Sequence, residues 1–383
     1  MKIAFDGIVL SKQATGVADI TISIINSFVK NFENDEIFIL VNNPLSEDVL
    51  SRINITNKVK IIQKQLPFLR SINLLWSVFK LNQIIRELDP DVFIESNFTI
   101  TPFFFPSKPQ LVVYVHDVAF LEYPQTVKCI TKTHLGLFFK RSLKRADLIW
   151  TNSEYTKQRL EKHFKQIIAG KSVFAGSGIN SAFLKKRNEV SNLTETNFQV
   201  GNLTIDFDYF LFVGTIEPRK NISFLLKLFA VLKDEKKRLI IVGGKGWGKE
   251  DKIISDIITT NGYPKDRLVF TGYVKANELV ALYKHATMFI STSLNEGLGL
   301  PQLEAMACGC PVITPHNSAM IEVVKDAGIT VDNWDLNKWE EAIKHLESHK
   351  DEYRMKGFLR VQQYDWDETI KKIYSEHLAL IHK

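Results

Sequence analysis

The sequence contains few cysteines, only Cys129, Cys308 and Cys310 among 383 residues. Three cysteines cannot build a disulfide framework, and the Cys-Gly-Cys pair beside Pro311 lacks the ligand spacing of a zinc site. Small secreted domains that depend on disulfides are therefore excluded, and we expect a protein of the reducing cytoplasm.

Long apolar runs and a strong excess of one charge are also absent. Asp6 interrupts the only apolar run near the start, and no run approaches the roughly 20 residues that a helix needs to span a bilayer. We therefore expect neither a signal peptide nor a transmembrane helix. The formal net charge is +6, with basic and acidic residues interleaved along most predicted helices. This balance does not imply a nucleic-acid partner, whereas a phosphorylated ligand or an anionic membrane surface fits it.

What the chain does contain is an alternation of strand-like and helix-like runs. They fill residues 1–187, as expected for a parallel sheet with helices on both faces. Residues 188–207 are polar and aperiodic, which indicates a linker. The alternation resumes over 208–365, and a last helix over 366–383 is expected to join the N-terminal domain. The predicted fold class is α/β, with two Rossmann-like doubly wound domains facing each other across a cleft.

The stretch SLNEGLGLPQLEAMACGCPVIT, residues 293–314, places two glutamates eight positions apart. In one helix, Glu296 and Glu304 would lie about 800° apart, roughly 80° from a common face, so a plain helix does not bring them together. The intervening glycines and Pro301 instead predict a turn that leads into a helix. We expect Glu296 on the loop and Glu304 in the first turn of that helix.

This loop follows the buried-strand pattern TMFIST, so it lies at the carboxyl end of a strand, where open α/β sheets bind ligands. Amides at a helix start favour an anion, and carboxylates accept hydrogen bonds from hydroxyls. An anion joined to several hydroxyls describes a nucleotide sugar. The residues alone fit equally well a Glu304 that complements the helix dipole and a Glu296 that is solvated.

The chain resembles the nucleotide-sugar glycosyltransferases of the GT-B fold, specifically the retaining glycosyltransferases of family 4. The resemblance rests on the order and spacing of five segments: VVYVHDVAFLEYP (112–124), VGTIEPRKN (213–221), LIIVGGKGW (239–247), VFTGYV (269–274) and the glutamate-containing segment 282–313. The segments GTIEPRKN and GKGW are most similar to the corresponding segments of mannosyl- and rhamnosyltransferases of bacterial surface polysaccharides.

The resemblance implies a donor site in the C-terminal half. It places Glu296 at hydroxyls of the transferred sugar, Glu304 at the ribose, and the Arg219–Lys220 pair at the diphosphate. Further donor contacts are implied for Gly297, Leu298, Gly299, Leu300 and Val274. A departing nucleoside diphosphate carries negative charge, and the resemblance implies that Arg219 and Lys220 neutralise it in place of a metal. We expect no metal and no cofactor.

In the N-terminal half, the resemblance points to Gly16 and His116. Gly16 immediately precedes a predicted helix, but Ala18 stands where family members often carry a second glycine, so a role in shaping the acceptor side is favoured over a phosphate contact. His116 follows the strand LVVYV and matches the family histidine beside the donor sugar. A lone histidine is more often structural, but its place at a strand end, followed by Asp117, favours function.

Other patterns indicate weaker alternatives. The segment GGKGWGKE is nearly a P-loop, but Glu250 stands where the magnesium-binding hydroxyl should be, so an ATPase or kinase is disfavoured. His345 and His349 have the i, i+4 spacing of a metal pair, yet they belong to a highly charged helix whose solvated face explains them. Three Asp-x-Asp triplets stand at predicted strand entries and at a helix start, where they need no metal.

Two stretches combine aromatic and basic residues, PFLRSINLLWSVFKL (67–81) and LFFKRSLKRADL (137–148). Each fits a helix resting on a membrane surface and equally a core helix with a polar back. A lipid-linked acceptor would make the membrane contact useful.

We therefore expect a retaining, metal-independent hexosyltransferase. Its expected substrates are a nucleoside diphosphate sugar, with GDP-mannose the best candidate, and a hydroxyl of a growing glycan or lipid-linked glycan such as O-antigen or capsule. By resemblance, front-face substitution is the expected route, in the cytoplasm or on the inner face of the cell membrane. The alternatives are an epimerase or phosphorylase of the same fold and a non-catalytic subunit that binds a sugar nucleotide.

Overall fold

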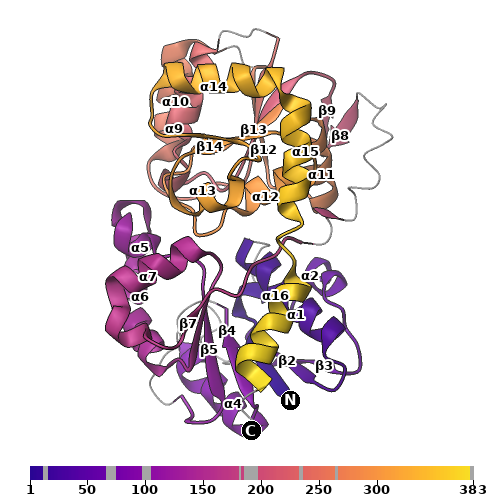
Figure 1. Cartoon of the computed structure of the whole chain (residues 1–383), viewed down its shortest axis with the longest axis vertical. Coiled ribbons are helices and arrows are strands. Elements are labelled where there is room, and N and C mark those ends of the chain that lie inside the picture. The colour runs from indigo at the N-terminus through magenta and orange to yellow at the C-terminus, as the bar shows by residue number, and fades with distance from the viewer. Residues whose placement is uncertain are drawn as a thin grey trace. The chain divides into compact units, whose positions relative to one another are not determined.

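The computed structural model describes residues 1–11, 16–65, 75–96, 105–180, 183–184, 197–232, 236–263 and 266–379. The chain forms two compact units. The first comprises Met1–Phe120, Cys129–Asn180 and Asp365–Lys383, and the second comprises Leu121–Lys128 and Ser181–Tyr364. Each unit contains its own parallel sheet, which confirms the predicted α/β class and the pair of Rossmann-like domains (Figure 1).

The first unit is built on a seven-stranded parallel sheet in the order β3-β2-β1-β4-β5-β6-β7. Its strands are β1 (Lys2–Asp6), β2 (Glu36–Val41), β3 (Val59–Gln63), β4 (Val92–Glu95), β5 (Gln110–Val115), β6 (Leu148–Thr151) and β7 (Ser172–Val173). Its helices are α1 (Gly16–Asn31), α2 (Glu47–Arg52), α4 (Asn82–Leu88), α6 (Cys129–Arg145), α7 (Glu154–Ile168) and α16 (Trp366–Ile373), with α5 (Ala119–Glu122) at the unit boundary. Its shorter turns are the 3-10 segment Ile8–Ser11 and the π-helical segments Trp76–Leu81 and Tyr374–Leu378, whereas the 3-10 segment Pro124–Thr126 belongs to the second unit.

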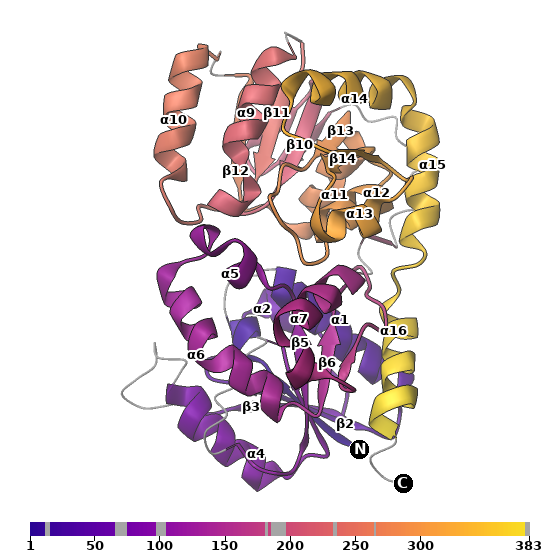
Figure 2. The same ribbon diagram turned by 60° about the vertical axis from the view of Figure 1, so that its left-hand side comes forward.

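The C-terminal helix α16 packs against α1, although more than 300 residues separate them in the sequence (Figure 2). The Asp367 carboxylate accepts hydrogen bonds from Ser27 Oγ at 2.8 Å and Asn31 Nδ2 at 2.9 Å, and it pairs with Lys30. These contacts tie the end of the chain to the first unit.

The second unit has a six-stranded parallel sheet in the order β12-β11-β10-β13-β14-β15. Its strands are β10 (Tyr209–Val213), β11 (Arg238–Val242), β12 (Leu268–Gly272), β13 (Met288–Ile290), β14 (Val312–Pro315) and β15 (Ile329–Val331). Its helices are α9 (Ile222–Val231), α10 (Glu250–Asn261), α11 (Ala276–His285), α12 (Leu300–Ala307), α13 (Ser318–Val324), α14 (Leu336–Ser348) and α15 (Lys350–Val361). The order places β10 between β11 and β13, so the chain winds first to one side of β10 and then to the other.

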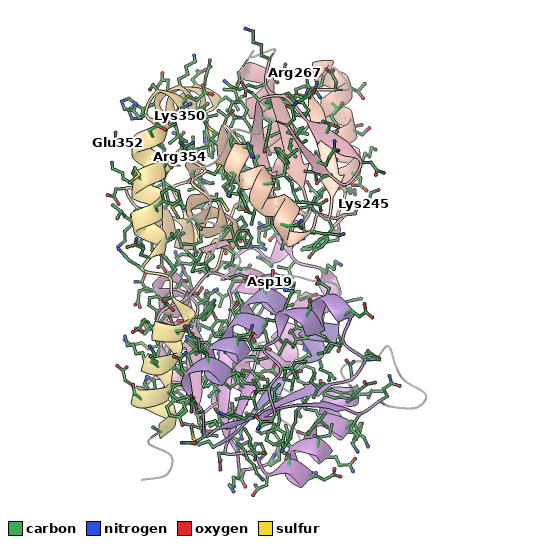
Figure 3. All side chains as sticks on the ribbon, turned by 90° about the vertical axis from the view of Figure 1, so that its right-hand side faces the viewer. Asp19, Lys245, Arg267, Lys350, Glu352 and Arg354 are labelled. Carbon is green, nitrogen blue, oxygen red and sulfur yellow. The ribbon has the colours of Figure 1, made fainter. Side chains whose placement is uncertain are left out.

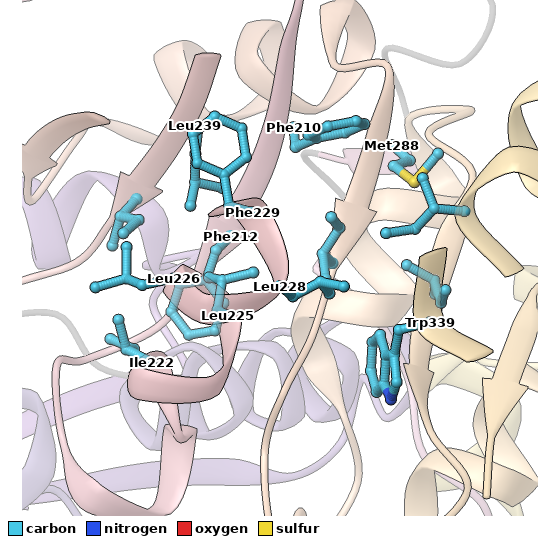
Figure 4. Packing of buried hydrophobic residues seen from close by; sticks show 14 of the residues in the cluster. Phe210, Phe212, Ile222, Leu225, Leu226, Leu228, Phe229, Leu239, Met288 and Trp339 are labelled. Atoms are coloured by element: carbon cyan, nitrogen blue, oxygen red, sulfur yellow. The ribbon is translucent and has the colours of Figure 1, made fainter. Parts of the chain in front are cut away.

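One face of this sheet forms a hydrophobic core with α9 and α14 (Figure 4). Alternate residues of β10, Phe210 and Phe212, point to the same face. Helix α9 meets them with apolar residues at helical spacing: Ile222, Leu225, Leu226 and Phe229, each at most 1% exposed. Burying one such side chain contributes about 1.5–3 kcal/mol. The turn between β10 and α9 is therefore flanked on both sides by segments that are anchored in this core.

Several elements depart from the sequence analysis. The expected linker 188–207 contains an antiparallel hairpin, β8 (Phe198–Val200) and β9 (Leu203–Ile205), closed at Gly201. Glu278 accepts a 2.8 Å hydrogen bond from Gly201 N and so ties the hairpin to α11. Strands β3 and β15 and helices α2 and α13 were also not predicted, since each spans no more than seven residues and shows little periodicity. Among the described helices, none is long and apolar enough to cross a membrane.

Candidate functional site

The candidate site lies at the carboxyl ends of β10 and β13, two neighbouring strands of the second unit. The chain leaves β10 toward β11 on one side, whereas β13 begins the strands on the other side. Loops at such a reversal of strand order diverge, and open α/β sheets bind ligands there. The loop after β10 contains Arg219 and Lys220, and the loop after β13 contains Glu296.

The cations stand on a single 3-10 turn, Pro218–Lys220. Pro218 opens the turn because its ring fixes φ, and Asn221 ends it in the left-handed region at φ 51° before α9 begins. The Lys220 side chain is only 10% exposed and that of Arg219 19% exposed. A lysine this buried requires a partner for its charge.

Glu296 provides that partner. Its Oε1 lies 2.5 Å from Lys220 Nζ, and its Oε2 accepts from Arg219 Nη1 at 2.9 Å. Burial alone would raise the pKa of Glu296, but the opposing charges of Lys220 and Arg219 lower it to about 2. The carboxylate is therefore ionised at any physiological pH, and each of its oxygens is held by one cation.

A second carboxylate, that of Glu217, lies on the other side of the same guanidinium. Glu217 Oε1 is 3.2 Å from Arg219 Nε and 3.0 Å from Nη2. Glu217 is 6% exposed, and burial raises its pKa above the ordinary 4.5, an effect that Arg219 and Lys220 offset only in part. Glu217 was not among the site residues predicted from the sequence, although it belongs to the GTIEPRKN segment.

Backbone contacts fix the two loops against each other. Leu294 N donates to Arg219 O at 2.8 Å, and Thr292 Oγ1 donates to Lys220 O at 2.9 Å. The Arg219 guanidinium also donates to Asn295 O at 2.8 Å. These contacts hold the cations in place, which is what stabilisation of a developing charge requires.

The helix after the loop begins one residue earlier than predicted. Gly299 is its N-cap, at φ 99°, a left-handed conformation that favours glycine, and α12 starts at Leu300 with Pro301 second. Glu304 therefore lies in the second turn of α12, which corrects the expected first-turn position. Since the dipole effect is confined to the first turn, a dipole role explains Glu304 less well than the sequence suggested.

Glu304 has a specific partner, Tyr283 of α11. The Tyr283 hydroxyl donates to Glu304 Oε2 at 3.0 Å, and Tyr283 is completely buried. Burial, followed by the Glu304 charge, raises the Tyr283 pKa well above its ordinary 10, so the hydroxyl keeps its proton. Of the remaining predicted contacts, Gly297, Leu298 and Gly299 are buried, Leu300 is half-buried at the start of α12, and Val274 is buried two residues after β12.

The near-P-loop segment has a structural explanation. Gly246 N donates to Ile216 O at 3.0 Å, and Ile216 N donates to Gly244 O at 3.0 Å, so the glycine-rich segment pairs with the chain that leads into the Pro218 turn. A Cβ at Gly243 would stand 2.0 Å from Gly214 O. Glycine is needed there for close approach of two backbone segments, so Gly243 is explained without a phosphate-binding role.

His116 and Gly16 belong to the first unit. His116 follows β5 and is 6% exposed, with Nε2 2.8 Å from Ser96 O and its own carbonyl accepting from Asn152 Nδ2 at 2.8 Å. A carbonyl oxygen can only accept, so Nε2 carries a proton. Burial lowers the His116 pKa below 6.5, which makes the neutral ring the dominant form at pH 7. Gly16 is the first residue of α1, and the residues just before it, 12–15, lie outside the described part of the chain.

The structure thus brings Arg219, Lys220 and Glu296 into direct contact and links Glu304 to Tyr283. It adds residues that the sequence analysis missed, namely Glu217, Tyr283, Asn295 and Ser318, whose Oγ accepts from Glu296 N at 3.0 Å. Within the described residues, no cluster of three or more His, Cys, Asp or Glu is arranged to hold a metal ion. His345 and His349 stack on an exposed face of the chain, with ring centroids 4.2 Å apart.

Both halves of the chain resemble known glycosyltransferases. The family model described as Glycosyltransferase Family 4 matches residues 36–182, and the model described as Glycosyl transferases group 1 matches residues 194–357. The solved structure of Anabaena HepE in complex with UDP and glucose has a TM-score of 0.72 with this chain, at 18% identity and over 99% of both chains. This likeness confirms the predicted GT-B fold.

Two curated relatives are O-antigen mannosyltransferases. The O-antigen chain mannosyltransferase B of Escherichia coli is 33% identical over 180 residues, which are 45% of this chain and 46% of that protein. The O-antigen chain mannosyltransferase RfbU of Salmonella typhimurium is 28% identical over 269 residues, 70% of this chain and 69% of that protein. The match thus spans about half of the first relative and about two thirds of the second. One glycosyltransferase model thus matches in each half of the chain, and the chain has the GT-B fold over nearly its whole length.

Proposed function

We propose that the protein transfers a hexosyl residue, mannose from GDP-mannose, to a hydroxyl of a growing surface glycan such as O-antigen, with retention of the anomeric configuration. The Arg219–Lys220–Glu296 cluster at the carboxyl ends of β10 and β13 supports this proposal most strongly. The choice of mannose rests on the two O-antigen mannosyltransferase relatives.

Arg219 and Lys220 are the proposed diphosphate ligands. Both cations are preorganised by Glu296 and by the backbone contacts of the loop after β13. Phosphate oxygens compete with the Glu296 carboxylate for the same N–H donors, and the planar guanidinium suits two phosphate oxygens at once. Charge that develops on the leaving diphosphate then meets donors already in place, so that little reorganisation is needed. We propose that this makes a divalent metal unnecessary.

Glu296 is a weak nucleophile and a weak base in this environment. Its pKa is about 2, and each oxygen is held by a cation. A covalent glycosyl–enzyme intermediate at Glu296 is therefore disfavoured, and its oxygens are better suited to accept hydrogen bonds from sugar hydroxyls. This supports front-face substitution, in which the departing phosphate oxygen takes the proton of the acceptor hydroxyl while the new bond forms.

His116 is proposed to hydrogen-bond the donor sugar rather than to transfer a proton. Its Nε2–H donates to Ser96 O, and the ring is neutral at pH 7 because burial lowers its pKa. In that tautomer Nδ1 has the lone pair, so it accepts a hydrogen bond from a hydroxyl and has no proton to give.

A membrane contact for a lipid-linked acceptor is proposed on α6. This helix has five basic residues and no acidic residue, and Ile130 and Leu137 on it are 85% and 59% exposed. Seven positions in a helix return to nearly the same face, so these two side chains lie on the same face of α6, about two turns apart. Each Lys or Arg near an anionic lipid surface contributes about 1 kcal/mol. Of the other stretch, 67–81, residues 67–74 lie outside the described part of the chain, and Trp76 is buried.

The membrane proposal is tested by sedimentation with vesicles of phosphatidylcholine alone or with phosphatidylglycerol. We expect binding only to the anionic vesicles, and its loss in Ile130→Ser/Leu137→Ser. Phe79→Ser, which changes a side chain 60% exposed on another segment, is the control. If Ile130→Ser/Leu137→Ser bound the anionic vesicles as well as Phe79→Ser does, the membrane contact would not lie on α6.

The transfer itself is tested by incubating the purified protein with GDP-mannose, UDP-glucose, UDP-galactose or dTDP-rhamnose and a lipid-linked mannosyl acceptor. Mannosyl product from GDP-mannose alone is the expected result. Transfer from another donor only would overturn the assignment of mannose. Release of free epimerised nucleotide sugar, or dependence on inorganic phosphate, would indicate an epimerase or a phosphorylase.

A further inference from the structure

The guanidinium of Arg219 lies between two nearly buried carboxylates. Glu217 holds its Nε and Nη2 at 3.2 and 3.0 Å, and Glu296 holds its Nη1 at 2.9 Å. Glu217 and Glu296 are 6% and 8% exposed. Glu296 is shared between Arg219 and Lys220, whereas the ion pair of Glu217 is with Arg219.

The charges of this cluster balance only without a donor. Lys220 and Arg219 supply two positive charges, and ionised Glu217 and Glu296 supply two negative ones. The diphosphate of a nucleotide sugar adds two negative charges. Excess charge in a partly buried site is costly, and protonation of one carboxylate reduces that cost.

Of the two carboxylates, Glu217 binds a proton more readily than Glu296. Glu296 has a cation on each oxygen, which keeps its pKa at about 2. Glu217 has one arginine on a single oxygen, and burial raises its pKa above 4.5. An added diphosphate raises that pKa further, since a nearby like charge favours the neutral acid.

We infer that Glu217 is a proton-binding positioning residue: a solvent proton bonds to its carboxylate when the donor diphosphate binds beside Arg219 and Lys220, and leaves when the nucleoside diphosphate is released. This inference rests on the proposed diphosphate site. The neutral acid accepts a weaker hydrogen bond from Arg219, so more of the guanidinium charge is directed at the phosphate oxygens.

The sign of the pH dependence follows from the groups that face Glu217. These are Arg219 and Lys220 of its own turn and Glu296 of the loop after β13. The donor complex binds more protons than the free protein between the two pKa values of Glu217, both above 4.5. Donor affinity therefore falls as pH rises through this interval, by up to about tenfold per pH unit.

The test is calorimetric titration of the full chain with GDP-mannose, or with UDP-glucose if GDP-mannose does not bind, in buffers of different ionisation enthalpy between pH 5.5 and 8. A nucleotide sugar is the proper probe, because the terminal phosphate of a free nucleoside diphosphate has a pKa of about 6 and would titrate itself. We expect uptake of a fraction of one proton per nucleotide bound in the wild type. Absence of uptake at every pH would overturn the inference without any variant.

Variants then assign the proton to Glu217. Glu217→Gln keeps the shape and an oxygen acceptor for Arg219, so we expect nucleotide binding without proton uptake and an affinity that is flat with pH. Glu217→Asp keeps a titratable group and should keep the uptake. Glu250→Gln is the matched control, since burial raises the pKa of Glu250 without a contribution from Arg219 or Lys220. Uptake that persists in Glu217→Gln, or disappears in Glu250→Gln, would contradict the assignment.

The outcomes separate this inference from the proposed function. If no nucleotide sugar binds or reacts, the proposed function fails. If a donor binds and is transferred but its affinity shows no proton linkage, only the role of Glu217 fails.

Discussion

Lys220 Nζ lies 2.5 Å from Glu296 Oε1, although the two residues are 76 positions apart in the sequence. Both side chains are only 10% exposed. The contact joins the turn after β10 to the loop after β13, and it holds a cation and a carboxylate at the carboxyl ends of adjacent strands. Such a pair has two roles, since it stabilises the fold and holds the Lys220 side chain in place at the candidate site. The two roles can be separated by experiment.

We predict that Glu296→Gln lowers the free energy of unfolding at pH 7 and that the difference from wild type shrinks as the pH falls. The folded pKa of Glu296 is about 2, below the ordinary 4.5, so its contribution is fully present above pH 4.5 and is lost toward pH 2. The shift corresponds to on the order of 3 kcal/mol at pH 7. Denaturant titrations at several pH values measure it.

Glu352→Gln is the control for this prediction. Lys356 lowers the pKa of Glu352 too, but Glu352 lies exposed on α15 (Figure 3), where ion pairs contribute little. Equal effects of the two substitutions at pH 7 would contradict a special role for the buried contact.

Arg219→Ala should reduce turnover on the order of 10²- to 10³-fold, the effect of losing one preorganised electrostatic contact, with little loss of fold. Arg219→Lys should rescue only in part, because a point charge does not reproduce the planar fork. Steady-state kinetics measure both. The control is Arg267→Ala. Arg267 precedes β12 and so lies at the amino ends of the strands, whereas Lys245, which follows β11, marks the carboxyl ends where the candidate site lies (Figure 3). Turnover of Arg219→Ala within a few-fold of wild type would show that the pair is misassigned.

Glu304→Ala should weaken binding of the free nucleoside diphosphate by about ten- to a hundredfold, since it removes the charged hydrogen bonds that we propose Glu304 makes to the ribose. Tyr283→Phe removes only the hydroxyl that orients Glu304 and should cost about two- to tenfold. Calorimetry with the ribonucleotide and its 2′,3′-dideoxy analogue separates the ribose contact from general damage. A loss of equal size for both ligands would argue against the ribose role.

Transfer should persist in excess EDTA, because we propose that Arg219 and Lys220 supply the positive charge that a metal would otherwise provide. Initial rates with and without chelator measure this. Complete loss of activity that is restored by magnesium or manganese would refute it.

The local features of the site could be predicted from the sequence. A strand pattern, glycines and Pro301 predicted the loop and α12, and the helix was displaced by only one residue because Gly299 accepts the left-handed N-cap conformation. The turn of Arg219 and Lys220 was likewise visible as Pro-Arg-Lys between an apolar strand and an apolar helix. Such features depend on neighbouring residues, which a sequence displays directly.

The contacts between distant segments could not be predicted. That Glu296 pairs with Arg219 and Lys220 depends on β13 lying beside β10, and its backbone contact with Ser318 depends on α13, a helix of seven residues with no clear pattern. Glu217 was overlooked because an acidic residue before a proline turn is usually solvated, and only the structure shows its burial. Sheet order, rather than local propensity, creates this cluster.

The central claim is that a hexose leaves its diphosphate on the face from which the acceptor approaches, at Arg219 and Lys220, and it is tested most directly by the configuration of the new bond. The measurement is NMR of the product formed from GDP-α-mannose and a lipid-linked or oligosaccharide acceptor, recorded early in the reaction. The account predicts an α-mannosidic linkage that is absent in the Arg219→Ala reaction over the same time. A β-mannosidic linkage would contradict it.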